Sequence, residues 1–326
     1  MGPPTSGPLA TALIAQLGEL QRWFEGRLVS EPAPTDEVVP AERYLDVDFL
    51  RAAIARAAST QAHAKHHVDG VELPDDGADA DLRIAVSRFT RQYSSSISAV
   101  ALVALARGVG LDLSASRCRL IVRSNIPFLV TLDLREDEAV RCAERPTTLP
   151  AAGPIVPTLA ELRAYVWRKL YAENIAPLFE RAREITKVSP RLMWTNAAEW
   201  VGLTSDTADE YLSPAAAAPF VEDRIAVLGA AALPGVAGPN PLTSLLTWSD
   251  PASDLPHGHH VRGVCCVTFY LSDRLGRLCA NCPFLPADDR LALVRERHGV
   301  PMGTPGGPAE QRAIRVGLEK LGIAGR

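Results

Sequence analysis

The sequence RGVCCVTFYLSDRLGRLCANCP, residues 262–283, holds four of the chain's six cysteines. Cys265 and Cys266 are adjacent, and after a spacer of twelve residues Cys279 and Cys282 form a C-x2-C pair. Reducing compartments keep unligated thiols reduced and rarely use them as disulfide bridges. Because the chain has no recognisable export signal, thiols at this density indicate metal ligands. The segment therefore predicts a cysteine-rich lobe built around a metal centre.

Two kinds of centre take four cysteine sulfurs, a tetrahedral zinc ion and an iron–sulfur cluster. A zinc site of the ribbon or finger type prefers two C-x2–4-C knuckles, each presenting two sulfurs from one tight turn. Neighbouring side chains on an extended backbone point to opposite sides. Cys265 and Cys266 can therefore share one compact centre only if the chain turns locally or the centre is larger than one ion. The adjacent pair favours a two-iron cluster over zinc.

The segments 262–270 and 278–283 together resemble the C-terminal signature of the FhuF family of bacterial siderophore-iron reductases. In that family a Cys-Cys pair, a spacer and a C-x2-C pair followed by proline hold a [2Fe-2S] cluster. The spacer of this chain is longer than is usual in the family, which indicates a longer turn within residues 271–277. The resemblance implies a ligand set that consists of Cys265, Cys266, Cys279 and Cys282.

Two upstream segments keep the order of the same family. Residues 93–113, a helix of small and apolar residues that ends in RGVGLDL, look like the family's N-terminal helix and turn. The sequence MWTN at 193–196 resembles its Trp-Gly-Asn segment, with threonine in place of glycine. The resemblance spans roughly residues 80–290 and is most specific at the cysteines. It implies a cytoplasmic oxidoreductase, a ferric-siderophore reductase that passes one electron from a [2Fe-2S] cluster to siderophore-bound Fe(III) and releases Fe(II).

Reduction is a reasonable way to release iron from a siderophore. Ferric iron is a hard ion held by hard oxygen donors, and one added electron weakens that hold. A [2Fe-2S] centre passes one electron at a time, at a potential set by hydrogen bonds, nearby charge and solvent exposure. The sequence has no G-x-G-x-x-G after a predicted strand and no P-loop, so no site for NAD(P)H, flavin or ATP is recognisable. We expect an external donor such as a ferredoxin or a flavin reductase.

Candidate contacts for the ferric siderophore lie near the cysteines and in the upstream segment. Positive charge beside a cluster raises its potential and attracts an anionic complex, which makes Arg262, Arg274 and Arg277 candidates. The resemblance favours Arg262, which matches a basic position before the family's Cys-Cys pair. Histidines near position 260 are candidates for substrate contact or as fallback ligands, although such loops are commonly only polar. The predicted substrate residues are Arg262, His259, His260, Trp194 and Asn196.

The remaining cysteines and histidines have simpler interpretations. Cys118 lies in an apolar strand and Cys142 in a charged segment, so core packing or incidental exposure explains both. His63 and His67 share a helical face, but no carboxylate motif accompanies them, which favours a solvated helix end. Neither group is predicted to bind the cluster.

Composition and charge exclude several other functions. The net charge of −4 and the scattered 34 basic residues argue against a nucleic-acid surface, which needs a concentrated basic stripe. The N-terminus lacks the basic region of a signal peptide, and Gln16 and Glu19 interrupt its apolar run. The longest mainly apolar stretch, 97–106, is far below the ~20 residues of a membrane span. We expect a cytoplasmic protein with no nucleic-acid partner and no membrane span.

The hydrophobic pattern predicts an α+β protein that is mainly α-helical, with a small β-sheet and a C-terminal cysteine-rich cluster-binding lobe. Residues 118–123 and 128–134 predict a hairpin or two sheet strands. Helices are predicted at 8–29, 48–63, 82–107, 159–185 (kinked or divided at Pro177) and 309–321. Segments rich in Gly and Pro divide the chain into an N-terminal region 1–150, a helical region 151–235 and the cluster lobe 236–326.

Two other functions stay open. A binding protein with a structural four-cysteine zinc site, such as an adaptor, would be colourless and redox-silent, so metal analysis separates it from a reductase. An iron–sulfur electron carrier or sensor would use the same ligands. The large helical body argues against a carrier, which needs little more than a cradle for the cluster, and ferric-siderophore binding would separate these two.

Overall fold

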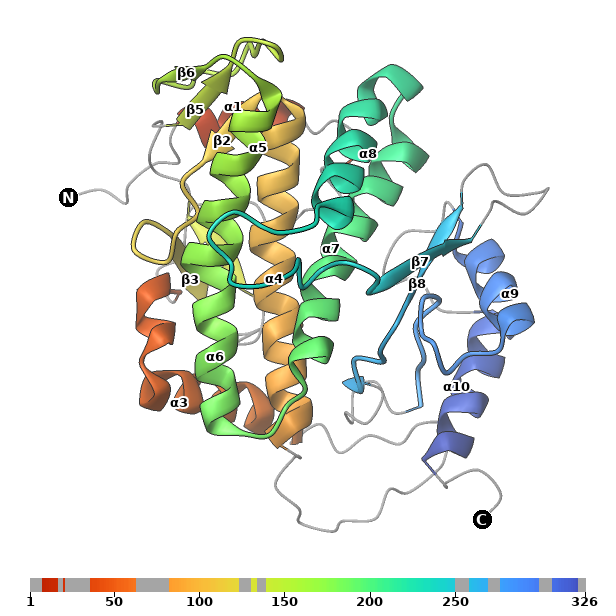
Figure 1. Cartoon of the computed structure of the whole chain (residues 1–326). Coiled ribbons are helices and arrows are strands. Elements are labelled where there is room, and N and C mark those ends of the chain that lie inside the picture. The colour runs from red at the N-terminus through yellow and green to blue at the C-terminus, as the bar shows by residue number, and fades with distance from the viewer. Residues whose placement is uncertain are drawn as a thin grey trace.

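The computed structural model describes residues 8–16, 20, 36–62, 82–122, 130–133, 139–249, 258–268, 276–298 and 307–321. Helices predominate in these residues and three small sheets accompany them, so the predicted mainly helical α+β class is confirmed (Figure 1). The helical elements are α1 (Pro8–Gln16), η2 (Ala41–Leu45), α3 (Val47–Ala62), α4 (Leu82–Ala106), α5 (Leu159–Trp167), η3 (Arg168–Ile175), α6 (Ala176–Ile185), α7 (Pro190–Tyr211), α8 (Pro214–Gly229), α9 (Ala287–Arg297) and α10 (Pro308–Lys320). The strands are β1 (Glu37–Pro40), β2 (Val109–Leu111), β3 (Arg119–Val122), β4 (Val130–Asp133), β5 (Ala139–Cys142), β6 (Ile155–Val156), β7 (Leu246–Ser249) and β8 (His259–Arg262).

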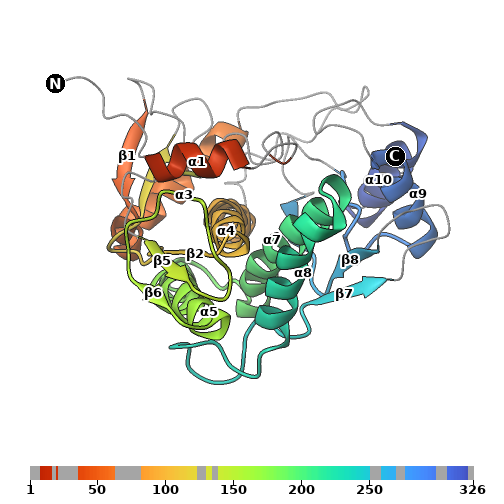
Figure 2. The same cartoon turned by 90° about the horizontal axis from the view of Figure 1, so that it is seen from above.

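Helix α4 is the centre of the helical body (Figure 2). It packs against α7, and α7 packs in turn against α8. Nearly every α4 residue from Ala85 to Ala106 is buried, and many are serine or alanine, which let neighbouring helices approach closely. Inside the bundle the Tyr93 hydroxyl donates to Asn174 Oδ1 at 2.6 Å, and Asn174 Nδ2 donates to the Leu113 carbonyl at 2.6 Å. These bonds satisfy buried polar groups and fix α4 against η3.

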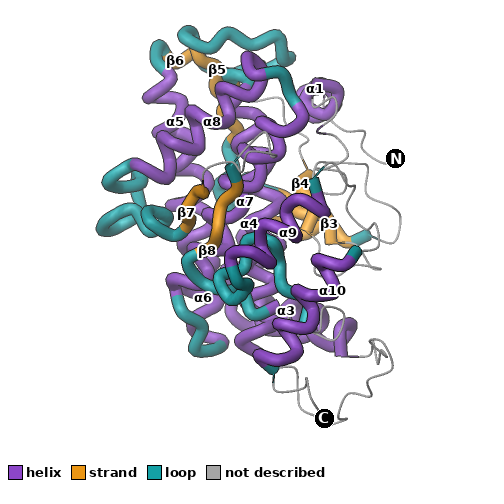
Figure 3. Tube along the Cα trace, turned by 90° about the vertical axis from the view of Figure 1, so that its right-hand side faces the viewer, coloured by secondary structure: helices purple, strands orange, loops and turns teal. Residues whose placement is uncertain are grey.

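The sheets are short and lie at the edges of the body (Figure 3). β3 and β4 pair antiparallel with Leu120 opposite Leu132, which confirms the predicted strand pair, and β1 extends this sheet beside β3. β5 pairs antiparallel with β2 and parallel with β6. Cys118 and Cys142 are both buried in the core, so packing explains them. β7 and β8 pair antiparallel beside α7, and β8 leads directly to the cysteine pair.

Most predicted helices agree with the structure. α3 and α4 confirm the helices expected at 48–63 and 82–107, and α10 confirms the short C-terminal helix. The helix predicted over 159–185 is divided as expected, because the π-helical stretch η3 ends just before Pro177, which lies in the first turn of α6. The helix predicted at 8–29 is α1 up to Gln16, and most of the rest lies outside the described residues. The division into 1–150, 151–235 and 236–326 stays a prediction.

The membrane prediction can be compared with the helices directly. Within the part of the chain that the structure describes, no helix combines the length and apolar character needed to cross a bilayer.

Candidate metal centre

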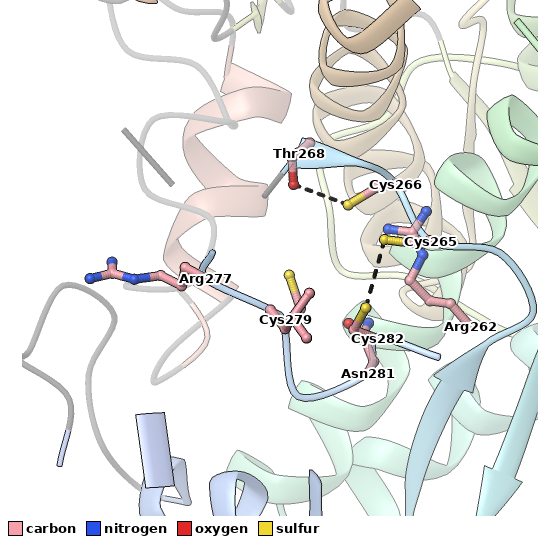
Figure 4. A pocket seen from close by; sticks show the side chains of 9 residues that line it. Arg262, Cys265, Cys266, Thr268, Arg277, Cys279, Asn281 and Cys282 are labelled. Carbon is pink, nitrogen blue, oxygen red and sulfur yellow. Dashed lines mark hydrogen bonds between the residues drawn. The ribbon is translucent and has the colours of Figure 1, made fainter. Parts of the chain in front are cut away.

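The four cysteines of the 262–283 segment line one small cavity between the end of β8 and the start of α9 (Figure 4). Cys265, Cys266 and Cys282 are buried, and Cys279 is partly exposed. The Sγ atoms of Cys265 and Cys282 are 3.7 Å apart, so the two sequence pairs meet in space. As the side chains lie, no three His, Cys, Asp or Glu residues in the described ranges are set to hold a single ion. The structure gathers the four predicted ligands around one cavity.

The backbone turns sharply at the adjacent cysteine pair. Val267, directly after it, has a φ of +56°, a conformation that β-branched residues rarely adopt. The Ser87 hydroxyl of α4 donates to the Cys266 carbonyl at 2.7 Å, which holds the turn against the helical body. The second pair lies on a tight turn in which the Cys282 N–H donates to the Cys279 carbonyl at 2.9 Å. The local turn that adjacent cysteines need in order to share a centre is therefore present.

Hydrogen bonds among the sulfurs lower the pKa of Cys266 and Cys282, which favours thiolate there, whereas the same bonds together with burial raise the pKa of Cys265 and Cys279. Hydrogen bonds from the thiols of Cys265 and Cys279 hold the pKa of Cys266 well below its usual range, and nearby Arg262 and Arg91 lower it further. The Thr268 hydroxyl also lies 3.1 Å from Cys266 Sγ. Thiolate is the form of cysteine that binds metals. An all-sulfur donor set beside buried positive charge fits a centre that takes four thiolate ligands.

Arg91 and Arg262 carry that positive charge, and both bind the carboxylate of Glu199 on α7, which is only 1% exposed. Arg91 of α4 donates from Nε and Nη2 to the two Glu199 oxygens at 2.8 and 3.0 Å. Arg262 Nη1 donates to Glu199 Oε2 at 2.6 Å, and Asn281 Nδ2 of the C-x2-C turn donates to Oε1 at 2.9 Å. Burial raises the pKa of Glu199, but Arg262 and Arg91 outweigh it and lower the pKa to about 2. We call Arg91, Glu199, Arg262 and Asn281 the Glu199 network.

Asn196 connects the Glu199 network to α4. Its Oδ1 accepts from Arg262 Nη2 at 2.5 Å, and its Nδ2 donates to the Ser87 carbonyl at 3.0 Å. Ser87 is the residue that holds the Cys266 carbonyl. Asn196 and Arg262 are both buried, so a substrate effect of either residue would act through the groups they hold.

A second cavity, of about 310 Å³, lies on the other side of the C-x2-C turn. Ala280 and Asn281 of the turn form part of its wall, and Asn281 lines both cavities. Other lining residues come from α4, α7, the β8 strand with the residue before it, and the C-terminal end of α9: Arg91, Glu199, Leu203, Asp206, Thr207, Glu210, Gly258, His259, His260, Val294, Arg297 and His298. This space reaches the back of the cysteine turn from the surface of the molecule.

The two cavity histidines are held in different ways. His260 is buried, with Nδ1 2.7 Å from Asp206 Oδ2 and Nε2 3.1 Å from Asn281 Nδ2. His259 is half-buried, and its Nδ1 lies 3.0 Å from the Ser249 hydroxyl. Burial, with some help from the charge of Arg290, lowers the pKa of His259. Because both histidines line the second cavity, a ligand bound there would lie next to them.

The remaining residues that the sequence analysis considered as possible ligands or substrate contacts are Trp194, Arg277 and several histidines. Trp194 packs edge-on against Phe179, with ring centroids 5.1 Å apart, and contacts Tyr171 as part of the helical core. Arg277 lines the cysteine cavity, but its exposed side chain pairs with Glu310 at 3.0 Å. The structure therefore does not bring Trp194 to the cysteines. His63, His66, His67, His257 and Arg274 lie outside the described residues.

Arg91 and Glu199 were not among the candidates from the sequence. Glu199 follows Asn196 by three residues and precedes Asp206 by seven, so the three polar groups share one face of α7. Polar residues at helical spacing on one face, with apolar residues such as Ala197, Ala198 and Val201 between them, are the signal that could have indicated a buried network. Arg91 gave no comparable signal, because its partner is 108 residues away in the sequence.

Comparisons with known proteins give a family and distant structural likenesses. The family described as "Ferric iron reductase FhuF-like transporter" matches residues 87–249, a range that ends before the four cysteines. No curated protein matches the chain. The aerobactin synthetase IucC from a hypervirulent pathotype of Klebsiella pneumoniae aligns with a TM-score of 0.39 and 12% identity, over 65% of this chain and 36% of that protein.

Proposed function

Because the chain belongs to the FhuF-like family of ferric iron reductases, we propose that it is a cytoplasmic ferric-siderophore reductase with a [2Fe-2S] cluster bound by Cys265, Cys266, Cys279 and Cys282. The observation that carries the proposal is the gathering of the four sulfurs around one cavity. When bound, the cluster would accept and donate single electrons. The family match supports the reductase role, and the cysteine cavity supports the cofactor.

The proposed reaction is a one-electron transfer. An external donor of the ferredoxin or flavin-reductase type supplies the electron, and siderophore-bound Fe(III) takes it up and becomes Fe(II). Since Fe(II) is held less well by hard oxygen donors, the ion then leaves the siderophore. The protein's residues supply the four thiolates, the buried charge of the Glu199 network and a place for the substrate.

The second cavity is the place that we assign to the ferric siderophore. Its volume of about 310 Å³ accommodates part of such a molecule. Ala280 and Asn281, which separate it from the cysteine cavity, belong to the turn between Cys279 and Cys282. A ligand held there against His259 and His260 would lie close to the cluster ligands. Arg262, Asn196 and Trp194 would then affect the substrate only indirectly.

Turnover tests the proposal. We expect chemically reduced protein, mixed anaerobically with a ferric siderophore and an Fe(II) chelator, to be reoxidised as the Fe(II)–chelator complex appears. Fe(II) formation should match the loss of reduced protein one for one, because each transfer moves one electron. A reduced cluster that persists beside every ferric siderophore tried, while still exchanging electrons with a ferredoxin, would instead establish the carrier or sensor function. One equivalent of zinc without visible absorption would establish the structural zinc site.

Filling the second cavity should inhibit this reaction selectively. Leu203 is partly buried and lines the cavity, so Leu203→Trp would occupy the space assigned to the siderophore. We expect at least a tenfold loss in kcat/KM for the ferric siderophore, with iron content and cluster spectrum unchanged. Ile225 on α8 is 61% exposed and is not among the cavity's lining residues, so Ile225→Trp is the matched control. Equal rates for the two variants would place the substrate elsewhere.

A further inference from the structure

One donor atom of the Glu199 network has no partner. Arg262 is 2% exposed, and its Nη1 and Nη2 donate to Glu199 and Asn196. Its Nε is buried and forms no hydrogen bond within the described residues. A buried donor left without an acceptor lowers stability, so such an atom in a folded protein needs an explanation, for example an acceptor on a bound group.

The position of Arg262 indicates which ligand that is. Arg262 lines the cavity of the four cysteines, and Figure 4 shows it among their side chains. Because one cavity is lined by Arg262 and by all four cysteines, the guanidinium lies near both cysteine pairs. Nη1 and Nη2 already donate to Glu199 and Asn196, so among the described residues Nε is the guanidinium nitrogen without an acceptor, on a side chain that lines the cavity of the four cysteines.

The charge of the Glu199 network adds a second effect. Arg91 and Arg262 carry two positive charges, and ionised Glu199 carries one negative charge, which leaves the three groups with one positive charge beside the cysteines. Every electron added to a cluster makes it more negative. A buried positive charge and a hydrogen bond to sulfur both stabilise the reduced form more than the oxidised form, and both therefore raise the reduction potential.

We propose that Arg262 sets the reduction potential of the bound cluster in two ways, by donating its free Nε–H to a cluster sulfur and by carrying, together with Arg91 and Glu199, a net positive charge to the site. This inference rests on the proposed function. It also changes the role expected from the sequence, because a buried and paired Arg262 does not meet the siderophore.

Three substitutions separate the two effects. Arg262→Gln keeps an N–H donor at the position of Nε and removes the charge, whereas Arg262→Lys keeps the charge and removes that donor. Arg262→Met removes both. We expect the first two to shift the equilibrium between cluster and mediator about tenfold toward the oxidised form, ~59 mV for one electron, and Arg262→Met to shift it further. The measurement is the midpoint potential by spectroelectrochemical titration at fixed pH, together with the iron content of each variant.

Two further variants complete the experiment. Arg277→Gln removes the same charge from the same cavity, but its side chain is 53% exposed, so solvent screening should keep the shift well under threefold. Arg91→Gln removes a network charge without changing Nε and should lower the potential as Arg262→Gln does. If every Arg262 variant fails to load iron, Arg91→Gln still tests the charge effect, and an unchanged potential in that variant contradicts the inference.

The outcomes distinguish the two proposals. A wild-type protein that binds no iron–sulfur cluster contradicts the proposed function. A wild-type protein that binds the cluster and reduces ferric siderophores, while Arg262 and Arg91 variants keep its potential, contradicts only the present inference. Equal shifts in Arg277→Gln and Arg262→Gln would also overturn it, since any nearby charge would then have the same effect.

Discussion

Replacing any one of Cys265, Cys266, Cys279 and Cys282 by alanine is expected to reduce the iron and sulfide content of anaerobically purified protein at least tenfold. These four sulfurs line one cavity, and an iron–sulfur cluster needs all four thiolates to complete the coordination of its irons. Among the residues that the structure describes, neither aspartate nor glutamate lines that cavity, so none of these offers a carboxylate in place of a lost thiolate. Iron and sulfide assays and the visible spectrum provide the measurement.

The chain provides two matched controls for this experiment. Cys118 and Cys142 are as buried as Cys265, Cys266 and Cys282 but lie in the main hydrophobic core, so Cys118→Ala and Cys142→Ala should keep full cluster content. Far-UV circular dichroism checks that all six variants fold. Loss of the cluster from a folded Cys118→Ala or Cys142→Ala protein would show that the ligand set is wrong. Full occupancy in any of the four ligand variants would do the same.

The sequence predicts the elements of this protein better than their assembly. The periodicity of 82–107 indicates a helix because every turn places apolar or small residues on the packed faces, and α4 is that helix. The β-branched residues of 118–123 and 128–134 indicate the pair formed by β3 and β4. Such local signals need no knowledge of distant partners.

The local turn at the cysteine site could also be expected from a local signal in the sequence. Adjacent Cys265 and Cys266 need a local turn or a larger centre, and the positive φ of Val267 provides the turn. A positive φ at valine is not a pattern that a sequence displays, because valine disfavours that conformation. The hydrogen bond from Ser87 to the Cys266 carbonyl joins residues 179 apart, so packing of the cysteine segment on α4 determines it.

Glu199 illustrates what the sequence could not show. A glutamate in a helix is usually exposed, and only tertiary structure brings Arg91, Arg262 and Asn281 to its carboxylate. The same contacts join α4, α7, β8 and the C-x2-C turn. A buried carboxylate between two arginines is costly to remove, because both cations lose their counter-ion and the Arg262 side chain is only 1% exposed to water.

Glu199→Gln is therefore expected to lower the free energy of unfolding by about 3 kcal/mol at pH 7. The pKa of Glu199 gives the same magnitude, since a fall from 4.5 to about 2 corresponds to about 3 kcal/mol of stabilisation of the ionised carboxylate. The folded pKa lies below the unfolded pKa. This stabilisation is therefore complete above about pH 5 and is lost as the pH falls toward 2. Urea unfolding of wild type and variant across this range measures it.

Glu222→Gln is the control for the pH dependence and for the size of the effect. Glu222 lies on α8 and pairs with Arg145 at 3.0 Å, but its side chain is 58% exposed, so the expected loss is below about 1 kcal/mol. The difference between wild type and Glu199→Gln should shrink as the pH falls, because protonation removes the same charge from the wild-type protein. A difference that stays constant from pH 7 to pH 3 would mean that Glu199 contributes through packing alone. The two arginines beside the cysteines would then not depend on its charge.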